Sequence, residues 1–184
     1  MMLNYYKLLV LITLNTKETD PFRQQMIDLL PRLRRFAYTL TSNRFDADDL
    51  VQAACERALS RRKQFKSGTH MDSWMFRIIH TLWIDTTRSL RFRTPHSTFD
   101  EKYIGKGTVN KERDKIEAKL LLHNVKQAMA QLSEKDRVVL ALVCVDGMSY
   151  KKTAETLNVP MGTVMSRLAR ARVKLNTLVN GHAV

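Results

Sequence analysis

The residues with the clearest chemical potential form a basic, regularly spaced segment near the C-terminus, from Gly162 to Lys174. At 100° per residue, its apolar side chains fall on one face of a helix and its small and polar side chains on the other, with cations along both edges. Guanidinium groups in such a position can bind guanine edges bidentately or hold phosphates. The segment therefore predicts a DNA-binding helix. Its core-facing residues are Val164, Leu168, Ala171 and Leu175, and its candidate contacts are Gly162, Thr163, Met165, Ser166, Arg167, Arg170, Arg172 and Lys174.

The residues just before this helix complete a larger motif. Ser149 to Leu157 predicts a short helix, and Asn158 to Pro160 a tight turn. Helix, turn and basic helix together are typical of a helix-turn-helix, which places its second helix in the major groove. The plainer interpretation is a solvated basic face on a terminal helix. The complete motif favours DNA binding over that interpretation.

A second group of residues mixes aromatic rings with cations in the first half of the chain. Trp74 and Trp83 lie among basic residues that run from Lys63 to Arg93, together with Phe76 and Phe92. Proteins hold single-stranded nucleic acid in this way, since bases stack on rings while cations follow the backbone. The alternative is that the rings are core residues. On composition alone the core interpretation is favoured for either tryptophan.

Composition points to a polyanionic partner and away from chemistry at a metal or nucleophile. The 184 residues are 44% hydrophobic and carry a formal net charge of +13, which is typical of a folded protein that meets nucleic acid or an anionic surface. Cys55 and Cys144 are expected to be buried, and no histidine or cysteine spacing predicts a metal or cofactor. No nucleophile–base pair or phosphate loop predicts an enzyme. The acidic residues Asp46, Asp48 and Asp49 are better explained as helix-start charges than as a cation site.

Hydrophobic periodicity predicts an all-α protein made of two small helical bundles joined by a flexible linker. The first bundle should contain a helix over 22–40 that kinks or restarts at Pro31, a helix capped by Asp46, and one capped by Asp72 or Ser73. In the second bundle, Ser133 should cap a buried helix that ends before Gly147 and contains the apolar run 138–145, for which a strand is the rejected alternative. The predicted boundaries are 21–94 for the first bundle, 95–114 for the linker and 115–184 for the second bundle. Fully extended, such a linker reaches roughly 65–70 Å, which would let the bundles sit apart on one duplex.

The first 20 residues are expected to form a loosely held extension. The apolar run from Leu8 to Leu14 is too short to span a bilayer, and no cleavage site of a signal peptide follows it. We therefore expect no stable membrane insertion, and a reducing cytoplasm fits the scarcity of cysteines.

The order of these motifs resembles the extracytoplasmic-function group of bacterial sigma-70-type sigma factors. The resemblance covers about residues 22–180 and rests on the segment Asp48–Gln52, the Trp-led helix that starts at Ser73–Trp74, and the terminal motif Gly162–Arg172. The sequence departs from the family pattern at Ala53, where Glu is frequent, and at His80, where Asn is frequent.

The resemblance implies a protein that binds core RNA polymerase and directs it to promoter DNA, with an anti-sigma factor that holds it inactive. It implies that the first bundle binds polymerase and the −10 element, and that the terminal motif reads the −35 element. The residues that match the polymerase-binding surface are Asp49, Gln52 and Glu56. The residues that match the −10 reader are Lys63, Lys66, Ser67, Thr69, His70, Arg77, His80 and Arg88.

Two alternatives to a sigma factor remain open at this point. A stand-alone helix-turn-helix regulator would bind DNA without polymerase, usually as a dimer, and would leave the Trp-led helix without a role. A basic protein of the membrane surface is a more remote alternative.

Overall fold

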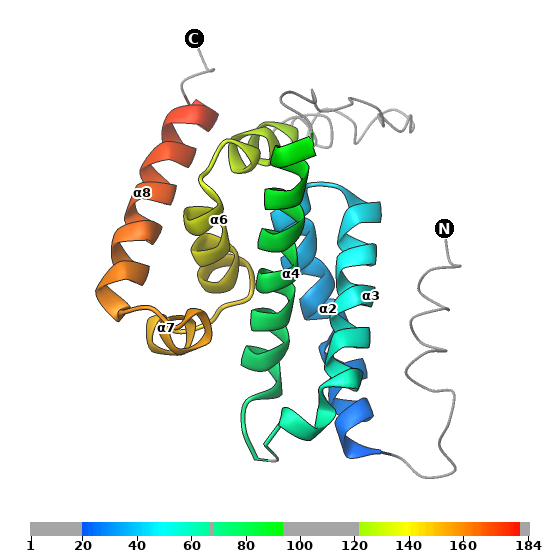
Figure 1. The fold of residues 1–184 in the computed structure, drawn as a ribbon. Helices are drawn as coiled ribbons and strands as arrows, with labels where there is room; N and C mark the ends of the chain where they lie inside the picture. Colours follow the sequence, from blue (N-terminus) through cyan, green and yellow to red (C-terminus); the bar gives the residue numbers. More distant parts are fainter. Residues whose placement is uncertain (1–19, 67, 94–121, 181–184) are drawn as a thin grey trace, which may run out of the picture.

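The computed structural model describes residues 20–66, 68–93 and 122–180, and every regular element in these ranges is a helix (Figure 1). This confirms the expected all-α class. The N-terminal extension before Asp20 and the expected linker over 95–114 lie outside the described residues.

Three long helices build the N-terminal half: α2 (Pro21–Thr41), α3 (Arg44–Ser60) and α4 (Met71–Arg93). A short turn of 3-10 helix, η1 (Arg62–Gln64), follows α3. The helix α2 passes through Pro31 without a break. Its buried residues recur on both sides of the proline, so packing of one continuous apolar stripe holds the helix together there.

The starts of α3 and α4 differ from the prediction. Asn43, rather than Asp46, caps α3, because the Asn43 side chain accepts hydrogen bonds from the amides of Phe45 and Asp46. The helix α4 begins at Met71, so Asp72 lies in its first turn and neither Asp72 nor Ser73 precedes it. Several polar residues lie near the start of each helix, and in both cases the predicted cap lies further along the chain than the true start of the helix.

Aromatic rings form much of the core of this half. Phe36 and Phe76 pack edge to face with 5.0 Å between ring centroids, and both are buried. Trp83 is 5% exposed, and half-buried Trp74 packs against Phe22. The core interpretation is thus confirmed for Phe76 and Trp83, which offer no stacking platform for bases.

The C-terminal half contains a helical stretch over 122–130 and then α6 (Glu134–Leu140), the π-helical turn η2 (Ala141–Val145), α7 (Tyr150–Leu157) and α8 (Met161–Asn180). Ser133 caps α6 as the sequence predicts, and Ser149, which the sequence places inside the short helix, is instead the cap that precedes α7. The apolar run over 138–145 is helical, which rules out the strand alternative. Cys55 is buried as expected, but Cys144, which lies in the π-helical turn, is exposed.

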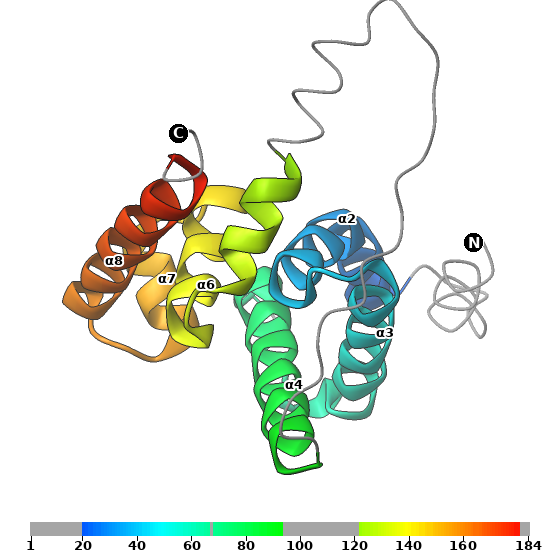
Figure 2. The same ribbon diagram turned by 90° about the horizontal axis from the view of Figure 1, so that it is seen from above.

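The two halves pack against each other within the described residues. Figures 1 and 2 show α6, α7 and α8 on one side of the molecule and α2 and α3 on the other, with α4 at the junction and α2 facing α6. Val138, Ala141, Leu142 and Met148 of the C-terminal half belong to the same buried cluster as the N-terminal helices. The halves therefore share a core instead of standing apart.

Candidate nucleic-acid interface

The helix-turn-helix has the predicted orientation. Val164, Leu168 and Ala171 are at most 2% exposed and belong to a second buried cluster with Val139 and Ala154. At the turn, Asn158 adopts a left-handed conformation with φ 52°, which asparagine tolerates better than most residues. The opposite face of α8 therefore points to solvent.

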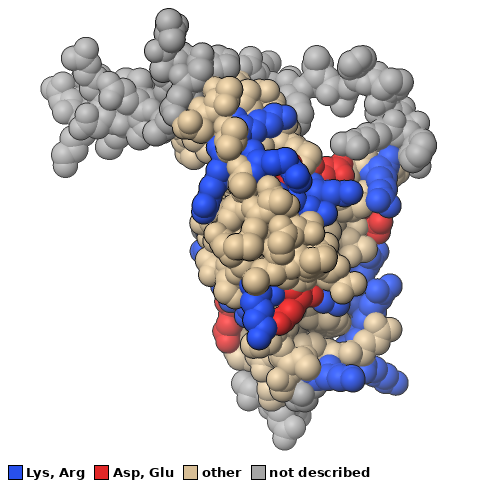
Figure 3. Space-filling view, turned by 90° about the vertical axis from the view of Figure 1, so that its left-hand side faces the viewer, with Lys and Arg blue, Asp and Glu red and all other residues tan. Residues whose placement is uncertain are grey.

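The predicted −35 residues lie on this outer face in most cases. Arg167 and Thr163 are half-buried, and Met165 is 49% exposed. Figure 3 views the α7–α8 side of the molecule and shows clusters of Lys and Arg with a few acidic groups between them. The exposed members of the predicted set are Gly162, Met165, Ser166, Arg170, Arg172 and Lys174.

The cations of α8 also contact the preceding segment of the same half. Arg170 pairs with Asp136 at 3.2 Å, and Lys174 donates to the carbonyl of Gln131 at 2.7 Å. Arg172 lies 3.8 Å from the sulfur of Cys144. These contacts hold the long side chains near the edge of α8, and the exposed ones can exchange them for phosphates at little cost.

The predicted −10 residues divide into two groups. The loop before α4 carries the first group, in which Lys63, Lys66, Thr69 and His70 are exposed, whereas Ser67 lies outside the described residues. The loop is anchored by Phe65, which packs on Phe22 and Trp74.

The second group lies on α4, where two of its three members meet the C-terminal half. Arg77 donates to the carbonyls of Thr156 and Glu155 at 3.0 and 2.8 Å. Half-buried His80 has a lowered pKa, because burial disfavours its charged form and the nearby positive charge of Arg167 adds to that effect. Arg88 is exposed. The structure thus brings parts of the predicted −10 and −35 sets to one junction, away from the exposed loop.

The predicted polymerase-binding residues form a stripe on α3. Asp49 and Glu56 are exposed and Gln52 is half-buried, with its amide donating to the Glu56 carboxylate at 3.0 Å. Their spacing of three and four residues places them on one helix face. Figure 1 shows α3 on the opposite side of α4 from α7 and α8, so this stripe is separate from the helix-turn-helix.

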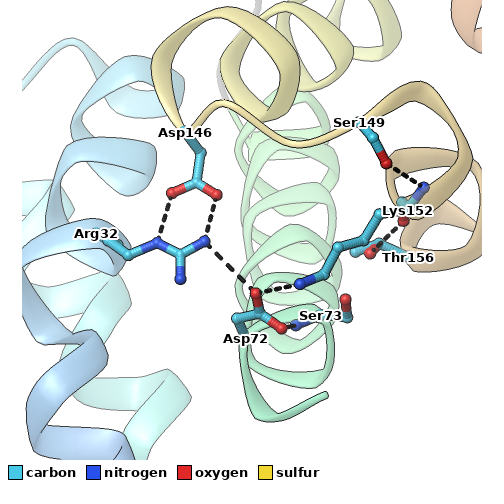
Figure 4. A network of polar contacts seen from close by, with 7 residues as sticks. All are labelled: Arg32, Asp72, Ser73, Asp146, Ser149, Lys152 and Thr156. Atoms are coloured by element: carbon cyan, nitrogen blue, oxygen red, sulfur yellow. Dashed lines mark hydrogen bonds and ion pairs between the residues drawn. The ribbon is translucent and has the colours of Figure 1, made fainter.

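Sequence reasoning missed a polar network at the junction between the halves (Figure 4). Arg32 of α2 contacts Asp146 through two hydrogen bonds, of 3.0 and 2.7 Å, and reaches Asp72 of α4 at 3.5 Å. Lys152 of α7 donates to the same Asp72 carboxylate at 2.5 Å. No local sequence pattern predicts that these four residues meet, because each of them lies on a different element.

The network favours the charged forms of Asp72 and Arg32. Burial would raise the pKa of Asp72, but the hydrogen bonds from Lys152 and the Ser73 amide, with the positive charges of Lys152 and Arg32, hold that pKa below its ordinary value of 3.8. The hydrogen bond with Asp146 raises the pKa of Arg32. Both effects favour the ionised forms of Asp72 and Arg32.

The described residues provide no group of side chains arranged to hold a metal ion. Of the acidic residues at the start of α3, Asp48 accepts two hydrogen bonds from Arg34, at 2.8 and 3.0 Å. Within the same part of the chain, no helix has the length and apolar character needed to cross a bilayer.

Comparison with known proteins covers both halves. Residues 122–175 match the family model described as sigma-70, region 4, and residues 26–80 match the sigma2 domain of PhyR. The chain is 32% identical to the ECF RNA polymerase sigma factor EcfG of Rhodopseudomonas palustris, over 88% of this chain and 86% of the relative. It is 30% identical to the ECF RNA polymerase sigma factor SigE of Mycolicibacterium smegmatis, over 83% of this chain and 59% of the relative.

A solved structure resembles the fold as well. The sigma factor RpoE from Bartonella quintana, in complex with the anti-sigma factor NepR, has a TM-score of 0.71 and 26% identity to this chain. The match covers 88% of this chain and 98% of the other, so it extends over both helical halves.

Proposed function

The chain belongs to the extracytoplasmic-function group of the sigma-70 family of RNA polymerase sigma factors, and we propose that its two halves divide promoter recognition between them. Residues 21–94 bind core polymerase and the −10 element, and residues 115–184 read the −35 element. The observation that carries this assignment is the outward face of α8, where Arg170 and Arg172 are exposed opposite the buried Val164 and Leu168.

On this proposal the chain contributes recognition, and the polymerase supplies the chemistry. Exposed Lys63, Lys66 and His70 lie before α4, where a single strand of the opened −10 element can follow the cations. The stripe of Asp49, Gln52 and Glu56 contacts the polymerase. Because its partner acts on the chromosome, the protein works in the cytoplasm.

An anti-sigma factor is the expected regulator. The solved sigma factor that this chain resembles is bound to the anti-sigma factor NepR. The N-terminal half matches a sigma2 domain, and the C-terminal half matches region 4, so both surfaces that such an inhibitor could cover are present. We propose that an anti-sigma factor binds the chain and so prevents transcription from the promoters that the chain recognises.

Run-off transcription tests the proposed function. Purified chain is added to core polymerase and a pool of genomic fragments, and the products are sequenced. We expect start sites that share one pair of −10 and −35 elements. Loss of these products without the chain is the control, and an absence of promoter-dependent products would contradict the proposal.

A paired substitution separates polymerase binding from DNA binding. Gln52→Ala on α3 should weaken binding to core polymerase and leave binding to isolated −35 DNA unchanged. Gln25→Ala, at an exposed position on α2, is the matched control and should change neither. A stand-alone regulator would instead bind its DNA tightly without polymerase, and neither substitution would change that DNA binding.

A further inference from the structure

The first two turns of α8 present a mostly apolar surface to solvent. In a helix-turn-helix, the N-terminal residues of the second helix contact the base edges. The exposed residues over 161–167 are Met161, Gly162, Met165 and Ser166, and only the serine has a side chain that forms strong hydrogen bonds. The end of α8 that is expected to meet the bases therefore offers them mainly apolar groups.

The polar side chains near this end are engaged within the protein. The Ser166 hydroxyl donates to the Thr163 carbonyl at 3.1 Å, so its hydrogen points back along the helix. Arg167 is half-buried, and Arg170, in the third turn, pairs with Asp136 at 3.2 Å. Base recognition at this end of α8 therefore depends on apolar contact as well as on hydrogen bonds.

The two exposed methionines of α8 differ in their surroundings. Met161 lines a shallow surface hollow together with Glu155 of α7 and Val159 of the turn. Met165 lies outside this hollow, and exposed Ala169 follows it by one turn on the same side of the helix. On this side of the molecule, Figure 3 shows an area without charged side chains between the groups of Lys and Arg. Met165 and Ala169 thus form an apolar patch that faces away from the core.

The chemistry of the major groove provides one apolar target for this patch. Base edges in that groove present hydrogen-bond donors and acceptors, with the C5-methyl group of thymine as the exception. Against a donor or acceptor, Met165 would displace water without replacing its hydrogen bonds, which costs free energy. Against the thymine methyl group, the same side chain buries apolar surface on both partners, which is favourable.

We propose that Met165 is a specificity-determining residue of α8, and that it selects thymine in the −35 element by contact with the C5-methyl group. Ala169 completes the apolar contact, and Gly162 on the same face lets the helix approach the base edges closely. This inference rests on the proposed function and deepens it, because it names a base that the −35 element contains and the atom group by which that base is recognised.

Uracil scanning of the −35 element tests the proposal in the holoenzyme. Run-off transcription first locates the promoter, and each thymine of its −35 element, on either strand, is then replaced singly by uracil. Uracil keeps every hydrogen-bonding group of thymine and lacks only the C5-methyl group. The affinity of the full chain with core polymerase is measured by competition between each uracil fragment and the parental fragment. We expect a position at which uracil lowers the affinity about fourfold, which corresponds to burial of one methyl group. An element without such a position would overturn the proposal.

Substitutions at Met165 assign the sensitive thymine to this side chain. Met165→Gln keeps the length and replaces the apolar end by an amide, so holoenzyme with this variant should bind the uracil and thymine fragments equally. Met165→Leu keeps an apolar side chain and should keep the preference for thymine. Met161→Gln is the same change at a methionine of similar exposure, 50% against 49%, and as the matched control it should also keep that preference. A preference for thymine that survives in the Met165→Gln variant would overturn the proposal.

Binding of the same variants to core polymerase without DNA distinguishes a base contact from a protein contact. Met165→Gln and Met161→Gln should bind polymerase as the parent chain does. Weaker polymerase binding by Met165→Gln alone would assign the apolar patch to a protein contact and overturn the recognition of thymine. Failure of the proposed function is distinguishable, because the parent chain with core polymerase would then give no promoter-dependent run-off product.

Discussion

At the residue scale, Arg170 is one of the exposed cations on the outer face of α8. Its guanidinium lies 3.2 Å from Asp136, a partner on the same half of the molecule. The pairing is exposed on the arginine side and contributes little to stability. Arg170 is therefore available for a base edge or a phosphate, and its substitution distinguishes the two.

Arg170→Ala should weaken binding to the matching −35 sequence by about 1–3 kcal/mol if the side chain reads a base edge. The measurement is a titration of the −35 duplex and of duplexes with single base changes. Asn176→Ala, one and a half turns further along α8, serves as a reference. An equal loss on every duplex would assign Arg170 to phosphate.

His80 of α4 lies close enough to Arg167 of α8 for the arginine charge to lower the pKa of the histidine. Burial first, and then the Arg167 charge, lower the pKa of His80, whereas Glu134 opposes the shift. A histidine with a lowered pKa in the folded form binds its proton more strongly when the chain unfolds. The packed form should thus be most stable above the ordinary pKa of 6.5 and lose stability as the pH falls below it.

Arg167→Gln should raise the pKa of His80 toward 6.5, because a cation beside the imidazole is removed. Titration of the His80 ring by NMR measures the shift, and Arg170→Gln is the control of equal charge change. Unchanged titration in the Arg167 variant would show that the two side chains are apart in solution.

At the element scale, the helix starts show where local reasoning succeeds. Ser133 directly precedes α6 and accepts from the amide of Asp136, as the sequence predicts. Ser149 precedes α7 in the same way and accepts from the amide of Lys152. At α3, Asn43 precedes the helix and Asp46 lies in its first turn, so two polar residues compete for the cap position. At α4, Asp72 lies in the first turn and its carboxylate contacts Lys152 and Arg32 from other elements. A helix cap is a local interaction, but the sequence predicts it correctly only when a single polar residue lies at the start of the helix.

Ser149→Ala should lower the stability of the helix-turn-helix by about 1 kcal/mol, since the Lys152 amide loses its acceptor. Urea unfolding followed by circular dichroism gives the free energy. Ser60→Ala is the comparison, because that hydroxyl donates to a carbonyl at the end of α3 and caps no helix start. Equal stabilities of the two variants would show that the cap contributes nothing.

At the scale of the whole molecule, the shared core should make both halves unfold together. Leu142 belongs to the C-terminal half in sequence and to the N-terminal core in space. The chain has two tryptophans, Trp74 and Trp83, and both lie in α4 of the N-terminal half. Their fluorescence therefore reports the N-terminal half and, because Arg137 of α6 lies over the Trp83 ring, its junction with the C-terminal half.

Leu142→Ala should destabilise the protein by about 2–5 kcal/mol, because it leaves a cavity at a site without solvent exposure. Tryptophan fluorescence and circular dichroism should both show the lower melting temperature. Leu175→Ala, which removes a half-buried side chain of the second cluster, should have a smaller effect. A tryptophan signal that melts at the parental temperature would show that the halves are independent.

The sequence by itself determined the all-α class, the helix-turn-helix and the outward face of α8. Helical periodicity and neighbouring caps involve residues within a few positions of each other, so the chain order already contains them. Tertiary structure decided that the halves share a core, that Arg77 contacts α7, and that Arg32 and Lys152 meet on Asp72. The pair Arg32 and Asp146 is separated by 114 positions. Contacts over such a separation depend on how whole helices pack, and no spacing pattern in one sequence encodes them.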